Sequence, residues 1–314
     1  MDPERILITG ASGFIGACLT RDLIASGHEV HVTLRAQSSR GRLAGLEGQF
    51  VEHQADLRDL AAVRRAVEAS RPEVIYHLAA HGALYQQQDR AAILASNLLG
   101  TCNLLDALDK REYRMLVQAG SSSEYGHKSA PMREDDRLEP RTDYAVSKAA
   151  ATMLCQAAAR QGRPVTTVRV FSAYGPWEDP SRLVPYVMEC CLQGETPRVT
   201  SGRQPRDFIY VEDCIELLKC AARSPAVSGQ VLHAGSGRQQ TVREMVETII
   251  GVCGQRQTTA QYGSEPARPD EPETWVASID RTVELTGWRP RHDLRSGIER
   301  TWAWRRRLRQ GLAA

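Results

Sequence analysis

The chain has 314 residues, of which 42% are hydrophobic and 25% are charged, and its formal net charge is +2 at pH 7. This length gives one large domain plus a smaller lobe with an ample core, and the nearly balanced charge gives no reason to expect a nucleic-acid partner. No apolar stretch is long enough to span a membrane and no signal peptide is apparent, so we expect a cytoplasmic protein without a membrane partner.

The N-terminus predicts a strand, a glycine-rich turn and a helix in direct succession. The apolar run Arg5–Thr9 is typical of a buried strand, residues 10–16 carry glycines spaced G-x-x-G-x-x-G, and residues 17–25 look helical. Together they predict the opening of a dinucleotide-binding unit, where glycine permits a tight turn and the helix N-terminus stabilises a pyrophosphate. The alternative is an ordinary glycine-rich loop.

Strands and helices alternate up to about residue 175, which predicts an α/β fold with a doubly wound parallel sheet. The predicted strands are 5–9, 29–34, 49–52, 74–78, 114–119 and 165–170. We assign residues 1–175 to a dinucleotide-binding domain, to which 207–233 returns, and residues 176–206 and 234–314 to a substrate lobe. The basic, aromatic run 300–309 predicts a closing amphipathic helix.

Tyr144 and Lys148 lie four residues apart in a segment that we expect to be helical, so their side chains share one helix face. A phenol is a poor base because its ordinary pKa is ~10, and a nearby ammonium favours the phenolate. The pair is therefore suited to passing a proton to or from an alcohol or ketone oxygen. Without the glycine turn, a packed ring beside a solvated amine would be the better interpretation.

Further motifs follow along almost the whole chain. They are Ala55-Asp-Leu57, Val74-Ile-Tyr-His-Leu-Ala-Ala80, Asn97-Leu-Leu-Gly-Thr101, Gly120-Ser-Ser-Ser-Glu-Tyr-Gly126, Val168-Arg-Val-Phe-Ser-Ala-Tyr-Gly-Pro176, Arg206-Asp-Phe-Ile-Tyr-Val-Glu-Asp213 and Thr286-Gly-Trp-Arg-Pro290. With them the chain resembles the extended short-chain dehydrogenase/reductases, and among these the nucleotide-sugar epimerases, dehydratases and 4-ketoreductases. The resemblance implies a Rossmann domain with a smaller C-terminal lobe that binds a nucleotide-diphosphate sugar.

The resemblance also implies which residues contact a nicotinamide dinucleotide. They are Gly10, Ser12, Gly13, Phe14 and Ile15 in the glycine turn, Asp56 and Leu57 at the adenine, Leu78, Ala79 and Ala80 after the fourth strand, and Lys148 at the nicotinamide ribose.

The preference between the two nicotinamide dinucleotides depends on the residues just after the second strand. Family members often have an acidic residue there for the adenosine ribose, whereas this chain has Arg35, with Ser38 and Arg40 close behind. Guanidinium and hydroxyl groups bind a 2′-phosphate that a carboxylate would repel. We therefore predict a preference for NADP(H), with NAD(H) as the alternative.

By resemblance, the third catalytic group is the hydroxyl four residues before Tyr125, which is Ser121, with Ser122 as the alternative. This hydroxyl would hold the reacting sugar oxygen near Tyr144. Related dehydratases carry acid/base groups where this chain has Ser122 and Ser123, and Glu124 would face the opposite way on a strand. Dehydration is therefore disfavoured.

The substrate lobe and its margin supply the remaining predicted contacts. By resemblance, Arg206 and Arg268 approach the diphosphate, since a guanidinium fork suits phosphate oxygens, unless an ion pair with an acidic neighbour occupies them. Ser172 stands where family members often have Asn, which points to a specialised substrate. The other predicted substrate contacts are His81, which could equally be structural, Tyr85, Ser122 and Ser123.

We expect NADPH-dependent reduction of a nucleotide-linked 4-keto-6-deoxyhexose at C4, with Tyr144 donating the proton, Lys148 lowering the phenol pKa and Ser121 polarising the carbonyl. The first alternative is a 4-epimerase with tightly bound NAD, ahead of a dehydratase or decarboxylase. A non-catalytic dinucleotide-binding sensor or scaffold is the alternative of another class, although such proteins typically lose the Tyr or the Lys.

The expected partners are the nucleotide sugar and a second copy of the chain. The family implies homodimerisation through helices that contain residues 97–108 and 144–160. The eight cysteines show neither a C-x-x-C nor a Cys/His zinc spacing, so we predict reduced thiols and no metal site.

Overall fold

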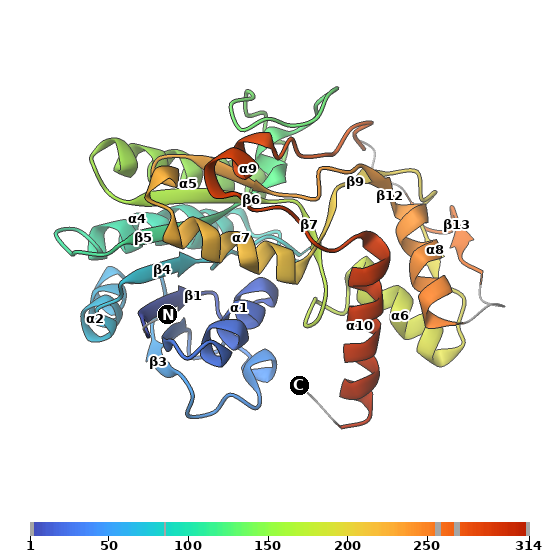
Figure 1. Ribbon diagram of the computed structural model, residues 1–314, viewed down its shortest axis with the longest axis horizontal. Coiled ribbons are helices and arrows are strands. Elements are labelled where there is room, and N and C mark those ends of the chain that lie inside the picture. The colour runs from blue at the N-terminus through green and yellow to red at the C-terminus, as the bar shows by residue number, and fades with distance from the viewer. Residues whose placement is uncertain (1–2, 85, 255–258, 267–270, 312–314) are drawn as a thin grey trace.

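The computed structural model describes residues 3–84, 86–254, 259–266 and 271–311. Its centre is a seven-stranded sheet with the spatial order β11-β6-β5-β4-β1-β2-β3, in which every neighbouring pair is parallel (Figure 1). The strands are β1 (Arg5–Thr9), β2 (Glu29–Leu34), β3 (Val51–Gln54), β4 (Val74–His77), β5 (Met115–Ser121), β6 (Val165–Val170) and β11 (Val231–Ala234). The order reverses between β1 and β4, and ligands bind at the carboxyl ends of the strands beside such a reversal.

Helices cover both faces of this sheet. On one face lie α1 (Phe14–Ala25) and α7 (Val211–Arg223), and on the other lie α2 (Leu60–Ser70), α4 (Gly100–Ala107) and α5 (Asp143–Arg160). The second layer also contains α3 (Arg90–Leu94) and a π-helical turn (Ala95–Leu99), which lead directly into α4. Because both faces are covered, β1 is a run of buried apolar residues. The predicted α/β fold with a doubly wound sheet is confirmed.

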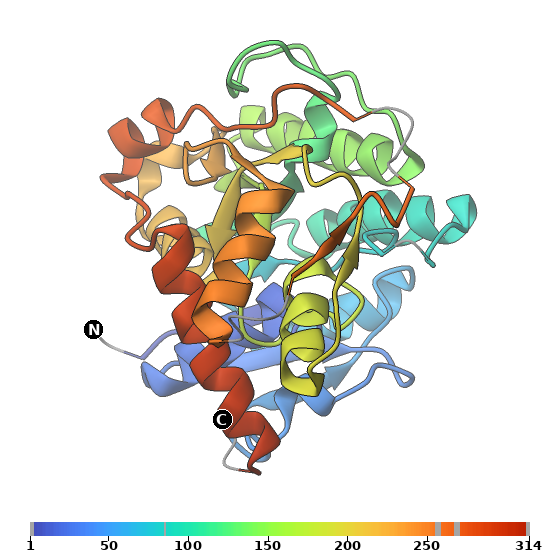
Figure 2. The ribbon, with the colours of Figure 1, turned by 90° about the vertical axis from the view of Figure 1, so that its right-hand side faces the viewer.

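The smaller lobe is built from helices and short strand pairs. In Figure 2, α6 (Leu183–Gln193), α8 (Val242–Cys253) and α10 (Leu294–Arg309) lie together, with α8 packed against both others. The paired strands are β12 (Gln240–Thr241) with β9 (Pro205–Arg206), and β13 (Gln261–Tyr262) with β8 (Arg198–Val199). The described part of the chain contains no helix long and apolar enough to cross a membrane.

Between the two parts, the chain crosses and returns. β7 (Ser172–Tyr174) pairs with β10 (Phe208–Tyr210), and α7 then leads back to the edge strand β11. α9 (Asp280–Thr286) packs against α7 and β11, and 3₁₀ turns occupy η1 (Gly41–Leu43), η3 (Ser122–Tyr125) and η4 (Pro225–Val227). One apolar core joins the α1–α7 face to the smaller lobe, while a second lies beneath α2, α4 and α5.

Three predicted strands have different bounds in the structure, and the smallest difference is in β4, which ends at His77, one residue earlier than expected. β3 begins at Val51, two residues later than expected, because this edge strand is largely exposed and its apolar pattern is weak. β5 continues through Gly120 to Ser121, since these small residues still pair with Arg169 and Val170 of β6. The extension of β5 determines where Ser121, the predicted third catalytic group, lies.

Candidate active site

The glycine turn after β1 is pressed against the segment that comes after β4. Gly10 has a φ of +78°, and a Cβ there would lie 2.5 Å from the backbone nitrogen of Ala79. A Cβ at Gly16 would lie 2.1 Å from the carbonyl oxygen of Gly10. Only glycine therefore permits this packing.

The same turn leaves the N-terminus of α1 open. Gly13 is the N-cap, and among the described residues no side chain caps the first amides of the helix. Ser12, Phe14 and Ile15 belong to this turn and the first helical turn, and Leu78, Ala79 and Ala80 come after β4 beside it. Free amides at a helix N-terminus favour an anion, so these residues fit the pyrophosphate of a dinucleotide.

Charged residues surround the ends of β2 and β3. The backbone N–H of Arg35 donates to Ser38 Oγ over 3.1 Å, and the Arg35 guanidinium makes no ion pair with any described residue. Arg40 instead donates through Nε to Glu52 over 3.0 Å. An incoming phosphate would therefore have to compete with Glu52 for Arg40, whereas Arg35 has no ion pair to exchange within the described part of the chain and interacts only through its charge with Asp56.

Asp56 and Leu57, which were predicted to lie at the adenine, differ in exposure. A hydrogen bond from Arg58 is the largest effect that lowers the pKa of the Asp56 carboxyl, and the charge of Arg35 lowers it further. The Leu57 side chain is buried in the core beneath α4, and its carbonyl accepts a hydrogen bond from Asn103 Nδ2. Leu57 is thus held in place by the protein itself.

Ser121, Tyr144 and Lys148 come together at the carboxyl end of β5. Ser121 is the last residue of β5, and Tyr144 and Lys148 lie in the first two turns of α5, which Thr142 caps. The Ser121 side chain is close enough to the Tyr144 phenol to lower its pKa against the effect of burial, and Lys148 is only 4% exposed. The serine motif at the end of β5 and the Tyr144–Lys148 pair of α5 are therefore close in space.

Burial dominates the titration of the pair. It raises the pKa of Tyr144, although the hydrogen bond with Ser121 and the charge of Arg182 oppose this effect. It also lowers the pKa of Lys148, against the opposing charge of Glu124. The prediction that the pKa of the Tyr144 phenol is lowered is therefore wrong. Desolvation by burial outweighs the opposing effects of Ser121 and of the Arg182 charge.

The residues after Ser121 form a 3₁₀ turn and not a continued strand. Ser122 is buried, and Ser123 Oγ lies 2.8 Å from Ser121 Oγ. Glu124 is fully buried in the turn, where it forms an ion pair with Arg169. The prediction that Glu124 lies on a strand and points away is wrong, because Glu124 lies in a 3₁₀ turn. Its carboxylate is nevertheless bonded to other residues of the protein.

Asn97 fixes the loop that contains His81. Its Oδ1 accepts from His81 N over 2.7 Å, while Nδ2 donates to the His81 carbonyl and to Ser147 Oγ, both over 2.8 Å. The π-helical turn places Asn97 at this position. The His81 backbone is therefore tied to α5, the helix of Tyr144 and Lys148, and Tyr85 lies outside the described residues.

The segment after β7 also borders the site, which the sequence analysis did not predict. Arg182 Nη2 donates to the Ala83 carbonyl over 2.6 Å, and Arg42 bridges the carbonyls of Ser12 and Trp177. Glu178 has one carboxyl oxygen that is shielded from solvent and unpaired among the described residues, and burial raises its pKa to about 8. In the sequence, the only sign of this segment's place at the site is that Glu178 closely follows Gly175-Pro176.

Of the predicted diphosphate ligands, the structure describes only Arg206, because Arg268 lies outside the described residues. Arg206 Nη2 is 2.9 Å from Glu271, and its guanidinium lies over the ring of Trp275. The alternative ion pair is thus present, with Glu271. Ser172 begins β7, and its N–H donates to the Asp207 carbonyl over 2.9 Å.

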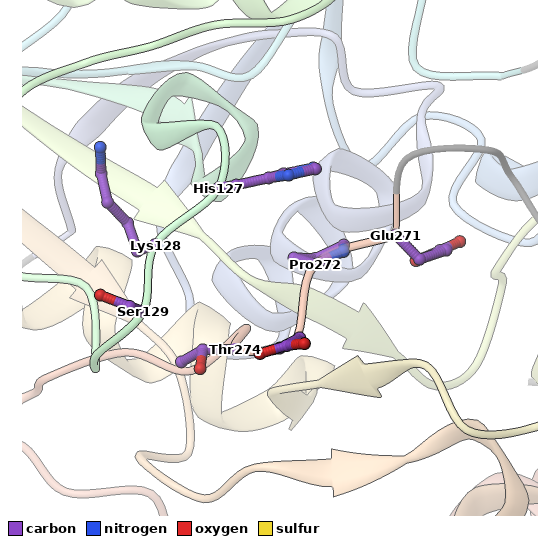
Figure 3. Close-up of a pocket in the computed structure, with 7 residues that line it drawn as sticks. His127, Lys128, Ser129, Glu271, Pro272 and Thr274 are labelled. Carbon is purple, nitrogen blue, oxygen red and sulfur yellow. The ribbon is translucent and has the colours of Figure 1, made fainter.

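A recess of about 450 Å³ lies beside Glu271. In Figure 3 two segments face each other across it, one with His127, Lys128 and Ser129 and the other with residues 271–274. The segments pair through a bridge between Lys128 and Thr274, and Lys128 is held by Glu139 over 2.8 Å. This recess joins the loop after the catalytic turn to the substrate lobe.

An enzyme that moves a hydride and a proton between a nicotinamide dinucleotide and a hydroxyl-bearing carbon needs the dinucleotide cradle and the Tyr–Lys pair in one cleft. Fold and site together therefore define the class of short-chain dehydrogenase/reductases. No group of His, Cys, Asp and Glu among the described residues is arranged to hold a metal ion.

Comparison with known proteins narrows this class. Residues 6–235 match the family described as "NAD dependent epimerase/dehydratase family", and the chain belongs to that family. It is 31% identical to UDP-glucose 4-epimerase of Mycolicibacterium smegmatis, over 95% of this chain and 97% of that protein. It is 29% identical to a probable UDP-glucuronate 4-epimerase of Rhizobium meliloti, over 96% of each.

A solved structure agrees with these relatives. The complex of UDP-glucose 4-epimerase from Thermus thermophilus with NAD has a TM-score of 0.85 and 28% sequence identity, and the match covers 95% of this chain and 98% of that one. The family resemblance inferred from the motifs is confirmed. The predicted preference for NADP(H) receives no support from these relatives.

Proposed function

We propose that the protein is a nucleotide-sugar 4-epimerase that oxidises C4 of a nucleotide-diphosphate hexose and reduces it from the other side. The observation that carries this proposal is the meeting of Ser121, Tyr144 and Lys148 beside the dinucleotide cradle, with only hydroxyl groups at positions 122 and 123. Two relatives that match along almost the whole chain are named as 4-epimerases of UDP-sugars, which supports the same reaction.

The residues of the site divide the reaction among them. The bound dinucleotide supplies hydride acceptance and return at C4. Tyr144 takes the proton of the C4 hydroxyl and later gives it back, and Ser121 hydrogen-bonds the same oxygen so that it stays within reach. Lys148 places a buried ammonium one turn away, which favours the phenolate form of Tyr144 that accepts this proton.

Dehydration and decarboxylation are less well supported. A 4,6-dehydratase must remove a proton from C5 and protonate the leaving hydroxyl of C6, which requires further acid/base groups. Ser122 and Ser123 are too weakly acidic for this task near neutral pH, and Glu124 is paired with Arg169. The site therefore favours chemistry that begins and ends at C4.

A 4-ketoreductase that uses NADPH is the second candidate, and Arg35 favours it. Its guanidinium has no ion-pair partner among the described residues and follows the strand beside which the adenosine ribose would lie. An arginine without a carboxylate partner is available to a 2′-phosphate. Exchangeable NADPH would suit single reduction of a 4-keto sugar better than epimerisation.

We also propose that Arg206 binds the substrate diphosphate after exchanging Glu271 for it, and that the chain is a homodimer. Leu99, Val146 and Met153 are three of the four large apolar side chains that the described residues expose, at 45–56%. Leu99 ends the π-helical turn that packs against α5, which carries the other two. A dimer mass in light scattering at micromolar concentration is expected, and a monomer would contradict this part.

The reaction is tested with purified protein and separate UDP-hexoses and UDP-hexuronates, each with NAD⁺ and with NADP⁺, followed by mass spectrometry and NMR of the sugar. An isomer of unchanged mass, inverted at C4, is expected. NADPH consumption with a nucleotide 4-keto-6-deoxyhexose, and a gain of two hydrogens, would select the reductase instead. Loss of water or carbon dioxide would contradict both candidates.

A further inference from the structure

A buried ion pair lies directly beneath the catalytic turn. Glu124 is 0% exposed and Arg169 is 2% exposed, and Arg169 Nε donates to Glu124 Oε2 over 2.8 Å. The same carboxylate oxygen accepts from Thr152 Oγ1 of α5 over 2.9 Å. The other oxygen, Oε1, accepts from the backbone N–H of Ser121 over 2.7 Å. Glu124 thus joins the catalytic serine, the catalytic helix and β6.

The partner of Glu124, Arg169, is held by Tyr125 and Glu134, and Tyr125 is bonded in turn to His233 of β11. Arg169 Nη1 donates to the Tyr125 hydroxyl and to the Glu134 carbonyl. His233 Nδ1 is 2.8 Å from the Ser278 carbonyl, so it donates there and Nε2 accepts from Tyr125 over 2.5 Å. Burial lowers the pKa of His233 to about 3, so this ring is neutral at physiological pH. The network therefore fixes Arg169 without adding a second positive charge.

Lys148 needs a negative charge nearby because it is buried. Among the groups that face it, His77 of β4 is uncharged, since burial lowers its pKa to about 3, and Cys155 of α5 is a thiol whose pKa burial raises to about 12. Tyr144 is a protonated phenol near neutral pH, because burial raises its pKa. Glu124 is bonded to the helix of Lys148 through Thr152, and its negative charge raises the pKa of Lys148 against the effect of burial.

We propose that Glu124 is a positioning residue of the reaction, which fixes the backbone of Ser121 and keeps Lys148 protonated as its buried counter-charge. Two separate oxygens serve the two elements, because Oε1 is bonded to Ser121 and Oε2 to Thr152 on the helix of Lys148. The effect of Glu124 on turnover rests on the proposed function. Its effect on dinucleotide affinity does not, because Lys148 is also a predicted dinucleotide contact. A purely structural ion pair would not change how the site responds to pH.

The test compares three variants with the wild-type protein. Glu124→Gln removes the charge, Glu124→Gln with Arg169→Met also removes the uncompensated arginine, and Glu124→Asp keeps the charge on a shorter side chain. Glu216→Gln is the control, because Glu216 pairs with Lys219 on α7 away from the site. Folding is checked by circular dichroism and thermal melting, and the double variant and the Asp variant preserve the test if the single Gln variant does not fold.

Each variant is measured for kcat, KM and dinucleotide Kd between pH 6 and pH 10. The two Gln variants are expected to lose about 10- to 100-fold in kcat with KM within about threefold. Both variants should lose activity and dinucleotide affinity at alkaline pH, and this loss should begin about one pH unit lower than in the wild-type protein. Glu124→Asp should keep the wild-type alkaline limb but lower kcat, because it loses the bond to Ser121, and Glu216→Gln should match the wild type.

A folded double variant with wild-type kcat and an unchanged alkaline limb would overturn the role of Glu124. If the wild-type protein turns over no nucleotide sugar, the proposed function fails, but the pH dependence of dinucleotide affinity still decides whether Glu124 keeps Lys148 charged. An unchanged pH dependence of affinity in all three variants would then overturn the inference on its own.

Discussion

The dinucleotide side and the substrate side of the proposed active site are built in different ways. On the dinucleotide side, glycines pack directly onto neighbouring backbone, and Lys148, the predicted catalytic lysine, is almost completely buried. On the substrate side, Arg206 and Glu271 keep about a fifth of their side-chain surface exposed, and the recess beside them is lined by loops. The dinucleotide side therefore depends on steric fit, whereas the proposed substrate side presents charges that a ligand can exchange.

The largest effect is expected at the centre of the cleft. Tyr144→Phe should reduce kcat by about 10² to 10⁴-fold, because it removes the group that exchanges the proton, while dinucleotide Kd changes little. The raised pKa of Tyr144 also fixes the direction of the pH dependence in the wild type, because the phenolate fraction grows as pH rises. Single-turnover oxidation of C4, followed by nicotinamide absorbance, should therefore accelerate as pH rises. Near-wild-type turnover of the Phe variant would remove Tyr144 from the mechanism.

The next effect tests whether the cradle depends on steric fit. Gly10→Ala combines a positive φ with a Cβ 2.5 Å from backbone, so dinucleotide binding should be lost and the melting temperature should fall. Gly27→Ala is the matched control, because Gly27 has a φ of +82° but open space around it. It should cost only about 1–2 kcal/mol of stability and leave dinucleotide Kd unchanged. Equal behaviour of the two variants would contradict the steric account.

A smaller effect is expected on the substrate side. Arg206→Ala should raise KM for the nucleotide sugar about tenfold with little change in kcat, since one charge-assisted contact to phosphate is lost. Arg203→Ala, which changes an exposed arginine just before β9, serves as the control in steady-state kinetics. If both variants raise KM equally, Arg206 has no specific role and the effect is general electrostatic attraction.

The smallest effect concerns the adenosine ribose. Arg35→Ala should weaken NADPH relative to NADH by roughly fivefold, the size of one exposed charge interaction. Isothermal titration with both dinucleotides measures the ratio, with Arg64→Ala on α2 as the control. An unchanged ratio would leave the reductase without the observation that favours it.

The sequence predicted the dinucleotide side better than the substrate side, and the contrast has a physical cause. A buried strand and a glycine turn, such as Arg5–Thr9 and the run from Gly10, obey local rules that leave a pattern in the chain. The pairing of Arg206 with Glu271 joins residues 65 positions apart through flexible side chains, so no local pattern specifies it.

Two errors at the catalytic turn have the same origin. Glu124 was expected on a strand, but it lies in a 3₁₀ turn from which its side chain reaches back to the N–H of Ser121. The pKa of Tyr144 was expected to fall near Lys148, but burial raises it. Both depend on how the turn and α5 pack together, which is a property of the tertiary structure and not of residue spacing.

The central claim is that a hydride leaves C4 and returns to the same carbon from the other side. It is tested most directly by incubating the enzyme with a UDP-hexose deuterated at C4 and analysing the product by NMR and mass spectrometry. The account predicts an isomer inverted at C4 that retains the deuterium, without consumption of added dinucleotide. An isomer that has exchanged its label for solvent hydrogen, or a product reduced at the expense of NADPH, would contradict it.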